Sequence, residues 1–173
     1  MKRGNFNAVM AYPTESCYGL GCDPRSRRAV LRILRLKRRP QAKVLILIAA
    51  DPHQLKPFVQ PDDLQQAVES GYWPGPVTLL LPASSRCPVW VRGRHASVAV
   101  RHTAHLPAAR LCRRLGTALV STSANRSGQR ALKRTGQVLH AFGNRVKVIR
   151  GNIGRSRRPS MIKDLATGRI LRN

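Results

Sequence analysis

Short apolar runs alternate with helical segments along this chain, and this alternation constrains the fold more than any other feature. The runs predicted as strands cover residues 9–12, 44–49, 77–81, 97–101, 118–122, 146–149, 161–164 and 169–171. Apolar spacing predicts a helix that begins after Ser26 and ends before Pro40, further helices near 62–68, 107–115 and 136–142, and one helical turn at 51–55. This order is typical of an α/β domain with a mixed sheet, and we expect a single domain over residues 1–173.

Particular residue types predict where the elements begin and end. Ser26 is suited to cap the start of the first long helix, and Asp62 or Asp63 the start of a later one. Gly116 follows the helix near 107–115 and is expected to form its C-cap. The stretch 14–23 contains two glycines and is predicted to be a turn-rich loop.

The charge of the chain is strongly one-sided. Thirty-two Lys and Arg stand against seven Asp and Glu, which gives a formal net charge of +25. Eight of the basic residues fall between positions 25 and 39, where they form either an RNA-facing ridge or an ordinary solvated helix face. So few acids disfavour a two-carboxylate glycosidase or a carboxylate-held two-metal site, and we expect no protein-bound metal. Sites that bind anions through Arg, Lys, Ser and Thr are well supplied.

The sequence predicts a cytoplasmic location without a membrane association. No apolar run approaches the ~20 residues that span a bilayer, and the N-terminal segment lacks a secretory apolar core. The four cysteines, at positions 17, 22, 87 and 112, form no CxxC pair and are expected to be reduced.

Three polar loops follow or precede predicted strands, where open α/β sheets bind their ligands. The first, YPTESCYGLG, offers the Thr14 hydroxyl and two glycines. The second, LKRRPQAK, gathers Lys37, Arg39 and Lys43, whose repulsion a phosphate would relieve. The third, VSTSANRSG, clusters hydroxyls beside Asn125 and could hold phosphate or carboxylate. Taken singly, each also fits a structural turn or a solvated surface, and no Walker A, GxGxxG or GxSxG motif is present.

Taken together and in order, these segments resemble the YrdC/TsaC family of threonylcarbamoyl-AMP synthases in its short, single-domain bacterial form. The matching pieces run from Ala8 to Arg172 and read YPTES with YGLGCDP, LKRRP with KVLILIA, WPGPVT, SVAVR, VSTSANRSG and PSMIKD. The resemblance implies a twisted sheet with a basic concave cleft. It also implies a nucleotidyltransferase that converts L-threonine, bicarbonate or CO2, and ATP into L-threonylcarbamoyladenylate and pyrophosphate.

The resemblance carries site roles onto matching residues of this chain. L-Threonine is expected to contact Thr14, Arg101, Ser121 and Ser160. The nucleotide is expected to contact Lys37, Arg39, Lys43, Ser97, Ser123, Asn125 and Arg172. Of these, Arg39, Lys43 and Ser123 are the residues expected to act in catalysis. Mg2+ would be carried on the triphosphate of ATP, so that few protein carboxylates are needed.

The resemblance also implies partners. The product would serve threonylcarbamoyladenosine formation in tRNAs that read ANN codons, through downstream transfer proteins, and the basic surface would bind tRNA or another structured RNA. An alternative hypothesis involves that surface alone. The protein would then be a non-catalytic module that binds double-stranded RNA or tRNA, or that acts in rRNA maturation. A third reading, a carbamoyl-transferring maturation factor, is disfavoured because the chain lacks the zinc-finger and acylphosphatase-like segments of such proteins.

Overall fold

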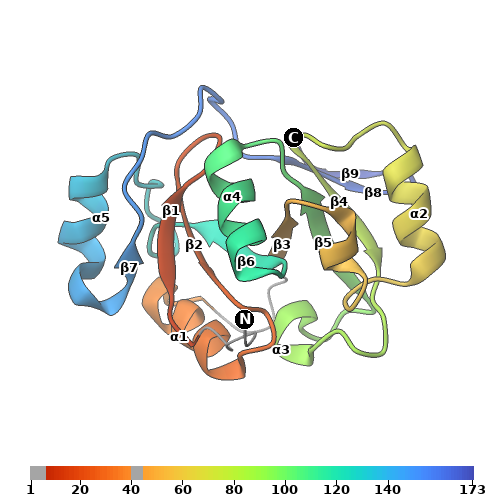
Figure 1. Ribbon diagram of the computed structural model, residues 1–173, viewed down its shortest axis with the longest axis horizontal. Coiled ribbons are helices and arrows are strands. Elements are labelled where there is room, and N and C mark those ends of the chain that lie inside the picture. Colours follow the sequence, from red (N-terminus) through yellow and green to blue (C-terminus); the bar gives the residue numbers. More distant parts are fainter. Residues whose placement is uncertain (1–6, 40–44) are drawn as a thin grey trace.

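Nine strands form one mixed sheet in the computed structural model, which describes residues 7–39 and 45–173 (Figure 1). The strand order is β7-β1-β2-β6-β3-β5-β4-β8-β9. The strands are β1 (Met10–Pro13), β2 (Tyr18–Cys22), β3 (Ile46–Ala49), β4 (Val77–Pro82), β5 (Ser97–His102), β6 (Leu119–Ser123), β7 (Lys147–Val148), β8 (Met161–Asp164) and β9 (Ile170–Arg172). The pairs β1–β7, β3–β5 and β4–β8 are parallel and the others are antiparallel, so the mixed sheet is confirmed.

The helices divide unevenly between the two faces of this sheet. They are α1 (Arg27–Lys37), α2 (Pro61–Glu69), α3 (Val89–Arg92), α4 (Leu106–Leu115) and α5 (Thr135–Phe142), with short 3-10 helices η1 (Pro52–Leu55) and η2 (Gly143–Arg145). Buried residues of α1, α2, α3 and α5 share one large core with the strands. Among the helices of the described residues, α4 alone packs into the second, smaller core; it lies in front of the central strands in Figure 1.

The alternation of side chains along the strands explains why an open face remains. In β3, Leu47 and Ala49 enter the large core, whereas Ile48 faces the side of α4. In β5, Val98 and Val100 enter the large core. The residues that alternate with these along β3 and β5 therefore face the other side of the sheet. Among the described helices, α4 alone packs on that side, and it covers one end only. The uncovered remainder of this face is where a ligand can reach the sheet.

Most predicted elements are confirmed, with boundaries shifted by a few residues. The Ser26 hydroxyl accepts a hydrogen bond from the N–H of Ala29 and caps α1 as expected. Gly116 ends α4 in the left-handed conformation, with φ of 64°. The predicted strand start at Val44 and the helix-ending Pro40 lie outside the described residues. No helix in the described part of the chain is both long and apolar enough to cross a membrane.

The prediction of a loop over 14–23 was wrong, because its second half forms the interior strand β2. A Cβ at Gly21 would lie 2.5 Å from the carbonyl oxygen of Val120 and 2.7 Å from the ring of Tyr12. Glycine is therefore used here for close approach between strands and not for a turn. The predicted Asp caps of α2 were also wrong, since that helix begins at Pro61 after Gln60, and the short helix α3 was not predicted.

Candidate substrate cleft

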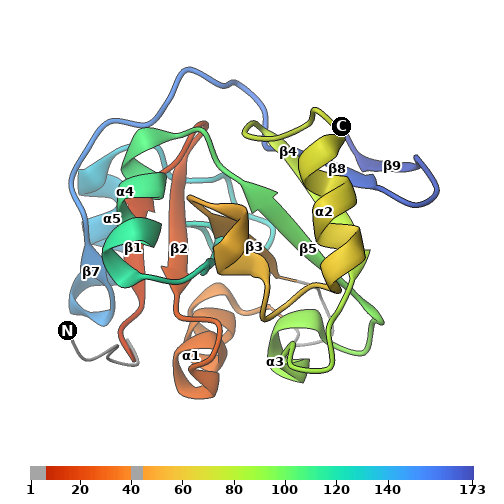
Figure 2. The same ribbon diagram turned by 45° about the vertical axis from the view of Figure 1, so that its right-hand side comes forward.

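A cleft of about 660 Å3 lies over the uncovered part of the sheet, a size typical of small-molecule sites. The loop between β7 and β8 arches over the top of the fold in Figure 2, and its residues 156–160 line the cleft. Nine of the residues expected to bind substrates line this cleft, namely Thr14, Arg39, Ser97, Arg101, Ser121, Ser123, Asn125, Ser160 and Arg172. Residues from the N-terminal loop, the middle strands and the C-terminal strand thus meet at one site. Lys43 lies outside the described residues.

The charges that line the cleft favour an anionic ligand. Six basic side chains take part, those of Arg39, Arg101, Lys133, Arg157, Arg158 and Arg172. Burial lowers the pKa of Arg39, and burial together with the nearby Arg101 and Arg39 lowers the pKa of Arg172. Mutual repulsion among guanidinium groups is relieved when a phosphate or carboxylate lies between them. In the described part of the chain, no group of three or more His, Cys, Asp or Glu side chains could hold a metal ion.

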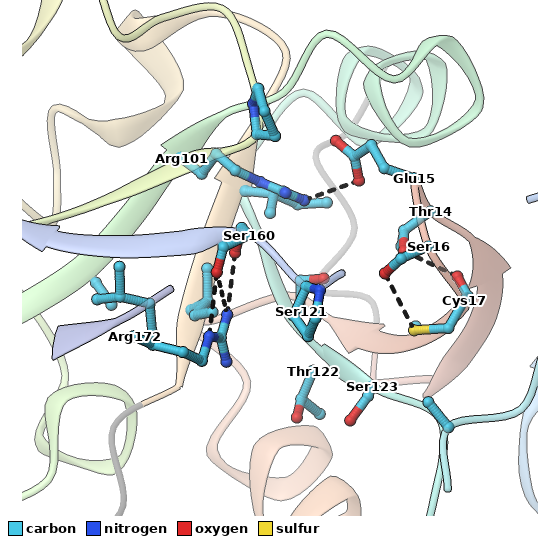
Figure 3. Close-up of a pocket in the computed structure, with 18 of the residues that line it drawn as sticks. Thr14, Glu15, Ser16, Cys17, Arg101, Ser121, Thr122, Ser123, Ser160 and Arg172 are labelled. Atoms are coloured by element: carbon cyan, nitrogen blue, oxygen red, sulfur yellow. Dashed lines mark hydrogen bonds and ion pairs between the residues drawn. The ribbon is translucent and has the colours of Figure 1, made fainter. Parts of the chain in front are cut away.

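The Thr14 side chain is fixed by its own turn. Its hydroxyl donates to the carbonyl oxygen of Cys17 at 2.8 Å, and its backbone N–H donates to the same oxygen at 2.9 Å (Figure 3). With its proton engaged there, the Thr14 hydroxyl oxygen can offer only lone pairs to a ligand. A Cβ at Gly19 would lie 3.1 Å from Thr14 Cγ2 and 3.6 Å from Ser121 Oγ, so the glycine leaves room between these two hydroxyl groups.

Arg101 projects from β5 and is almost fully buried. Its Nη2 donates to Oε2 of Glu15 at 3.1 Å, an ion pair between residues far apart in sequence (Figure 3). Among the described residues, Arg101 Nε has no hydrogen-bond partner. Because Arg101 also lines the cleft, its guanidinium group is suited to receive a carboxylate there.

The third polar loop forms a closed turn at the end of β6. Ser123 Oγ donates to Oδ1 of Asn125 at 2.6 Å, and Asn125 Nδ2 donates to the carbonyl oxygen of Gln129 at 2.5 Å. Both side chains therefore hold the turn in shape while they line the cleft.

Lys37 and Arg39, both expected to contact the nucleotide, lie in different places. Arg38 ends α1 in the left-handed conformation, with φ of 51°, and turns the chain between them. Lys37 Nζ lies behind the turn and donates to Ser123 O at 2.5 Å and to both oxygens of Asn125 at 2.9 Å. All three ammonium hydrogens are thus engaged, and Lys37 positions the turn. Burial, followed by the nearby charge of Arg39, lowers its pKa to about 8.

Ser160 and Arg172 act as a pair at the opposite side of the cleft (Figure 3). Arg172 Nη2 donates to the carbonyl oxygen of Ser160 at 2.7 Å and lies 3.1 Å from its hydroxyl. The same hydroxyl is 2.9 Å from that of Thr78 in β4. These contacts join β9 to β8 and β4 and place the C-terminal guanidinium at the cleft.

Sequence reasoning missed two residues that organise this site, Glu15 and Thr103. Glu15 accepts from the Thr103 hydroxyl at 2.8 Å as well as from Arg101. Its place directly after Thr14, in a chain with only seven acids, was a usable signal. Thr103 carried no such signal, because it stands outside every motif.

Comparison with known proteins places the whole chain in one group. The family model described as "Telomere recombination", which covers Sua5, YciO and YrdC, matches residues 5–173. The threonylcarbamoyl-AMP synthase of Chromobacterium violaceum is 56% identical over 95% of this chain and 86% of its own length. That of Thiobacillus denitrificans is 54% identical over 99% and 90%, and that of Escherichia coli O6:H1 is 46% identical over 97% and 90%.

Solved structures agree with this grouping. The P. abyssi Sua5 structure complexed with L-threonine superimposes with a TM-score of 0.83 at 32% identity, over 92% of this chain. The chain spans about half of that longer protein, 48%. E. coli YciO superimposes with a TM-score of 0.78 over 96% of this chain and 82% of its own, and at 24% identity it supports the fold alone.

Proposed function

Because this chain belongs to the Sua5/YciO/YrdC family, we propose that its cleft makes L-threonylcarbamoyladenylate. The reaction takes L-threonine, bicarbonate or CO2, and ATP, and releases pyrophosphate. The enzyme is a threonylcarbamoyl-AMP synthase, as are relatives that share about half of its sequence. The observation that carries the proposal is the meeting of Thr14 and Arg101 with Arg39 and the Ser123 turn in one cleft. The synthase name of these relatives favours catalysis over the RNA-binding module.

L-Threonine is assigned to the side of the cleft formed by Thr14, Arg101 and Ser121. The Arg101 guanidinium suits the substrate carboxylate, and the acceptor lone pairs of Thr14 suit its ammonium or hydroxyl group. Ser121 is buried on the floor between them. Ser160 is assigned to the threonine as well, although its hydroxyl already contacts Thr78 and Arg172.

ATP is assigned to the side formed by Arg39, Ser97, the turn of Ser123 and Asn125, and Arg172. Lys43 belongs to the same set by its place in the sequence. Lys37 contributes from behind by holding the turn. Mg2+ enters on the triphosphate, which supplies most of its ligands in a cleft so poor in carboxylates.

The chemistry then follows from positioning and charge. The neutral threonine amine attacks the carbon of CO2 or bicarbonate and forms a carbamate. With CO2 the nitrogen releases a proton to solvent, and with bicarbonate a C–O bond breaks and water leaves. A carbamate oxygen next attacks the α-phosphorus of ATP, and the bond to pyrophosphate breaks. Negative charge develops on the phosphate oxygens, where Arg39, Lys43 and the polar turn of Ser123 stabilise it. No covalent intermediate with the enzyme is needed.

We also assign the chain to tRNA modification in the cytoplasm, with downstream proteins that transfer the threonylcarbamoyl group. Exposed arginines of α1 form a ridge for RNA, namely Arg27, Arg28, Arg32, Arg35 and Arg38. Because α1 packs into the large core, this ridge lies on the side of the sheet away from α4 and the cleft. RNA bound there would not block the entry of small substrates.

Pyrophosphate release by the purified protein tests the proposal. With ATP, Mg2+ and bicarbonate, we expect release that depends on L-threonine and that Arg39→Ala abolishes. Arg35→Ala removes an exposed arginine of α1 that lies outside the cleft lining, and it should keep full activity. Release without threonine, or none at all from a protein that also fails to bind ATP by calorimetry, would refute the synthase assignment.

A further inference from the structure

Glu15 is the one acidic side chain among the described residues that line the cleft. It stands against six basic side chains, and yet it lies directly beside the buried Arg101. The side chain of Arg101 is 7% exposed and that of Glu15 is 21% exposed, so the cation is enclosed while the carboxylate still reaches the cleft. A single negative charge among so many positive ones indicates that Glu15 has a role in the cleft.

The direction of the Glu15 carboxylate is fixed by a chain of hydrogen bonds. The backbone N–H of His105 donates to Thr103 Oγ1 at 3.2 Å, so that the Thr103 proton is free to go to Oε1 of Glu15, 2.8 Å away. Arg101 holds the other oxygen. Thr103 is itself 2% exposed, and this support is therefore rigid.

The backbone of Glu15 is held as firmly as its side chain. Its carbonyl oxygen accepts from the N–H of Ser156 at 3.1 Å, in the loop that arches over the cleft. A Cβ at Gly154 would lie 2.7 Å from that oxygen, so this loop packs directly on the peptide of Glu15. Glu15 is thus anchored by three residues, Arg101, Thr103 and Ser156, and cannot swing away from the threonine side of the cleft.

We propose that Glu15 determines specificity for a zwitterionic amino acid over an anion that lacks an amino group. An α-amino acid carries a carboxylate and an ammonium on one carbon, and the ion pair of Arg101 and Glu15 presents the complementary charges 3.1 Å apart. The Arg101 guanidinium, which lines the cleft, takes the carboxylate, and Glu15 faces the ammonium together with Thr14. A hydroxy acid would meet the same guanidinium but would place no positive charge near Glu15. This inference rests on the proposed threonine site.

Glu15→Gln tests the proposal because it keeps the shape and removes the charge. Binding is measured by calorimetry with L-threonine and with 3-hydroxybutanoate, which lacks the amino group. We expect affinity for L-threonine to fall about tenfold, and affinity for 3-hydroxybutanoate to rise about threefold since Arg101 loses its competing anion. Asp51→Asn removes an exposed carboxylate outside the cleft lining and should change neither value.

The failure of this inference is distinguishable from failure of the proposed function. If the wild type shows threonine-dependent pyrophosphate release but Glu15→Gln weakens both ligands equally, Glu15 only supports Arg101 and the proposal is overturned. If Glu15→Gln does not fold, Thr103→Val is the second variant. It keeps the charge of Glu15 and removes the hydroxyl that donates to its carboxylate. It should then lower the preference for L-threonine over 3-hydroxybutanoate about threefold. An unchanged preference in Thr103→Val would also overturn the proposal.

Discussion

Replacing Lys37 by methionine should loosen the polar turn that follows β6. It should impair the use of ATP more than the binding of L-threonine. Methionine keeps most of the buried aliphatic stem and removes the ammonium group. The side chain is 3% exposed, so water cannot readily replace the lost donors. The three acceptors, Ser123 O and the two oxygens of Asn125, would lose their common partner.

The expected loss of stability follows from these acceptors. Ser123 O still accepts from the N–H of Asn125, and Asn125 Oδ1 still accepts from Ser123 Oγ, so each of these two should cost about 0.5–1 kcal/mol. The backbone carbonyl of Asn125 loses a charged donor, which should cost about 1–3 kcal/mol. The sum is roughly 2–5 kcal/mol in the free energy of unfolding, or about 5–15 °C in Tm for a chain of this length.

Thermal unfolding and steady-state kinetics check this expectation side by side. In Lys37→Met, the KM for ATP should rise about tenfold, while the KM for L-threonine should change less than twofold, because the turn lies on the side of the cleft that we propose for the nucleotide. Lys133→Met is the matched control, since it removes an exposed cation from the same cleft without a buried contact, and its Tm should stay within about 2 °C. If the two variants melt alike, the Lys37 ammonium does not hold the turn.

Three further outcomes are expected. Gly21→Ala should destabilise the protein by about 1–3 kcal/mol or more in urea unfolding, because its Cβ would meet the carbonyl oxygen of Val120; stability equal to wild type would contradict the packing of β2. Tyr18→Phe removes a fully buried hydroxyl with two 2.7 Å contacts and should cost about 1–2 kcal/mol, a value that the same unfolding curves would reveal. The pKa of Lys37 lies near 8 in the folded protein and at 10.5 ordinarily, so the unfolded chain binds more protons between these values. The stability gap between wild type and Lys37→Met should therefore widen from pH 8 to 10, and a gap that narrows would refute the lowered pKa.

The elements that were predicted well are those specified by local physics. α1 has apolar residues at helical spacing and a serine at its N-cap, and both features act within a few residues. The prediction failed at β2 because Gly21 packs against Val120, a residue about 100 positions away that becomes a neighbour only in the sheet. Periodicity carries no information about such a contact.

In the candidate site, too, local features were predicted and long-range contacts were not. Polar residues after strands were expected to meet at one place, and Thr14 and Ser123 do line one cleft. The roles within that set depended on the direction of each side chain. Lys37 and Arg39 stand two positions apart, and the left-handed turn at Arg38 sends one behind the loop and leaves the other in the cleft lining. The role of Glu15 depends on its contacts with Arg101 and nearby residues, which lie 86 or more positions away in the sequence.

The order of strands in the sheet has a consequence for how the protein is made. β8 and β9 follow the other strands in the sequence, yet β8 pairs with β4 near the middle of the chain, and β9 brings Arg172 to the cleft. Most of the large core comes from residues before 147 and can close before residues 161–172 have been synthesised. A chain that stops before β8 would therefore be compact but would lack one wall of its cleft. Synthesis of β8 and β9 is thus needed to complete the cleft.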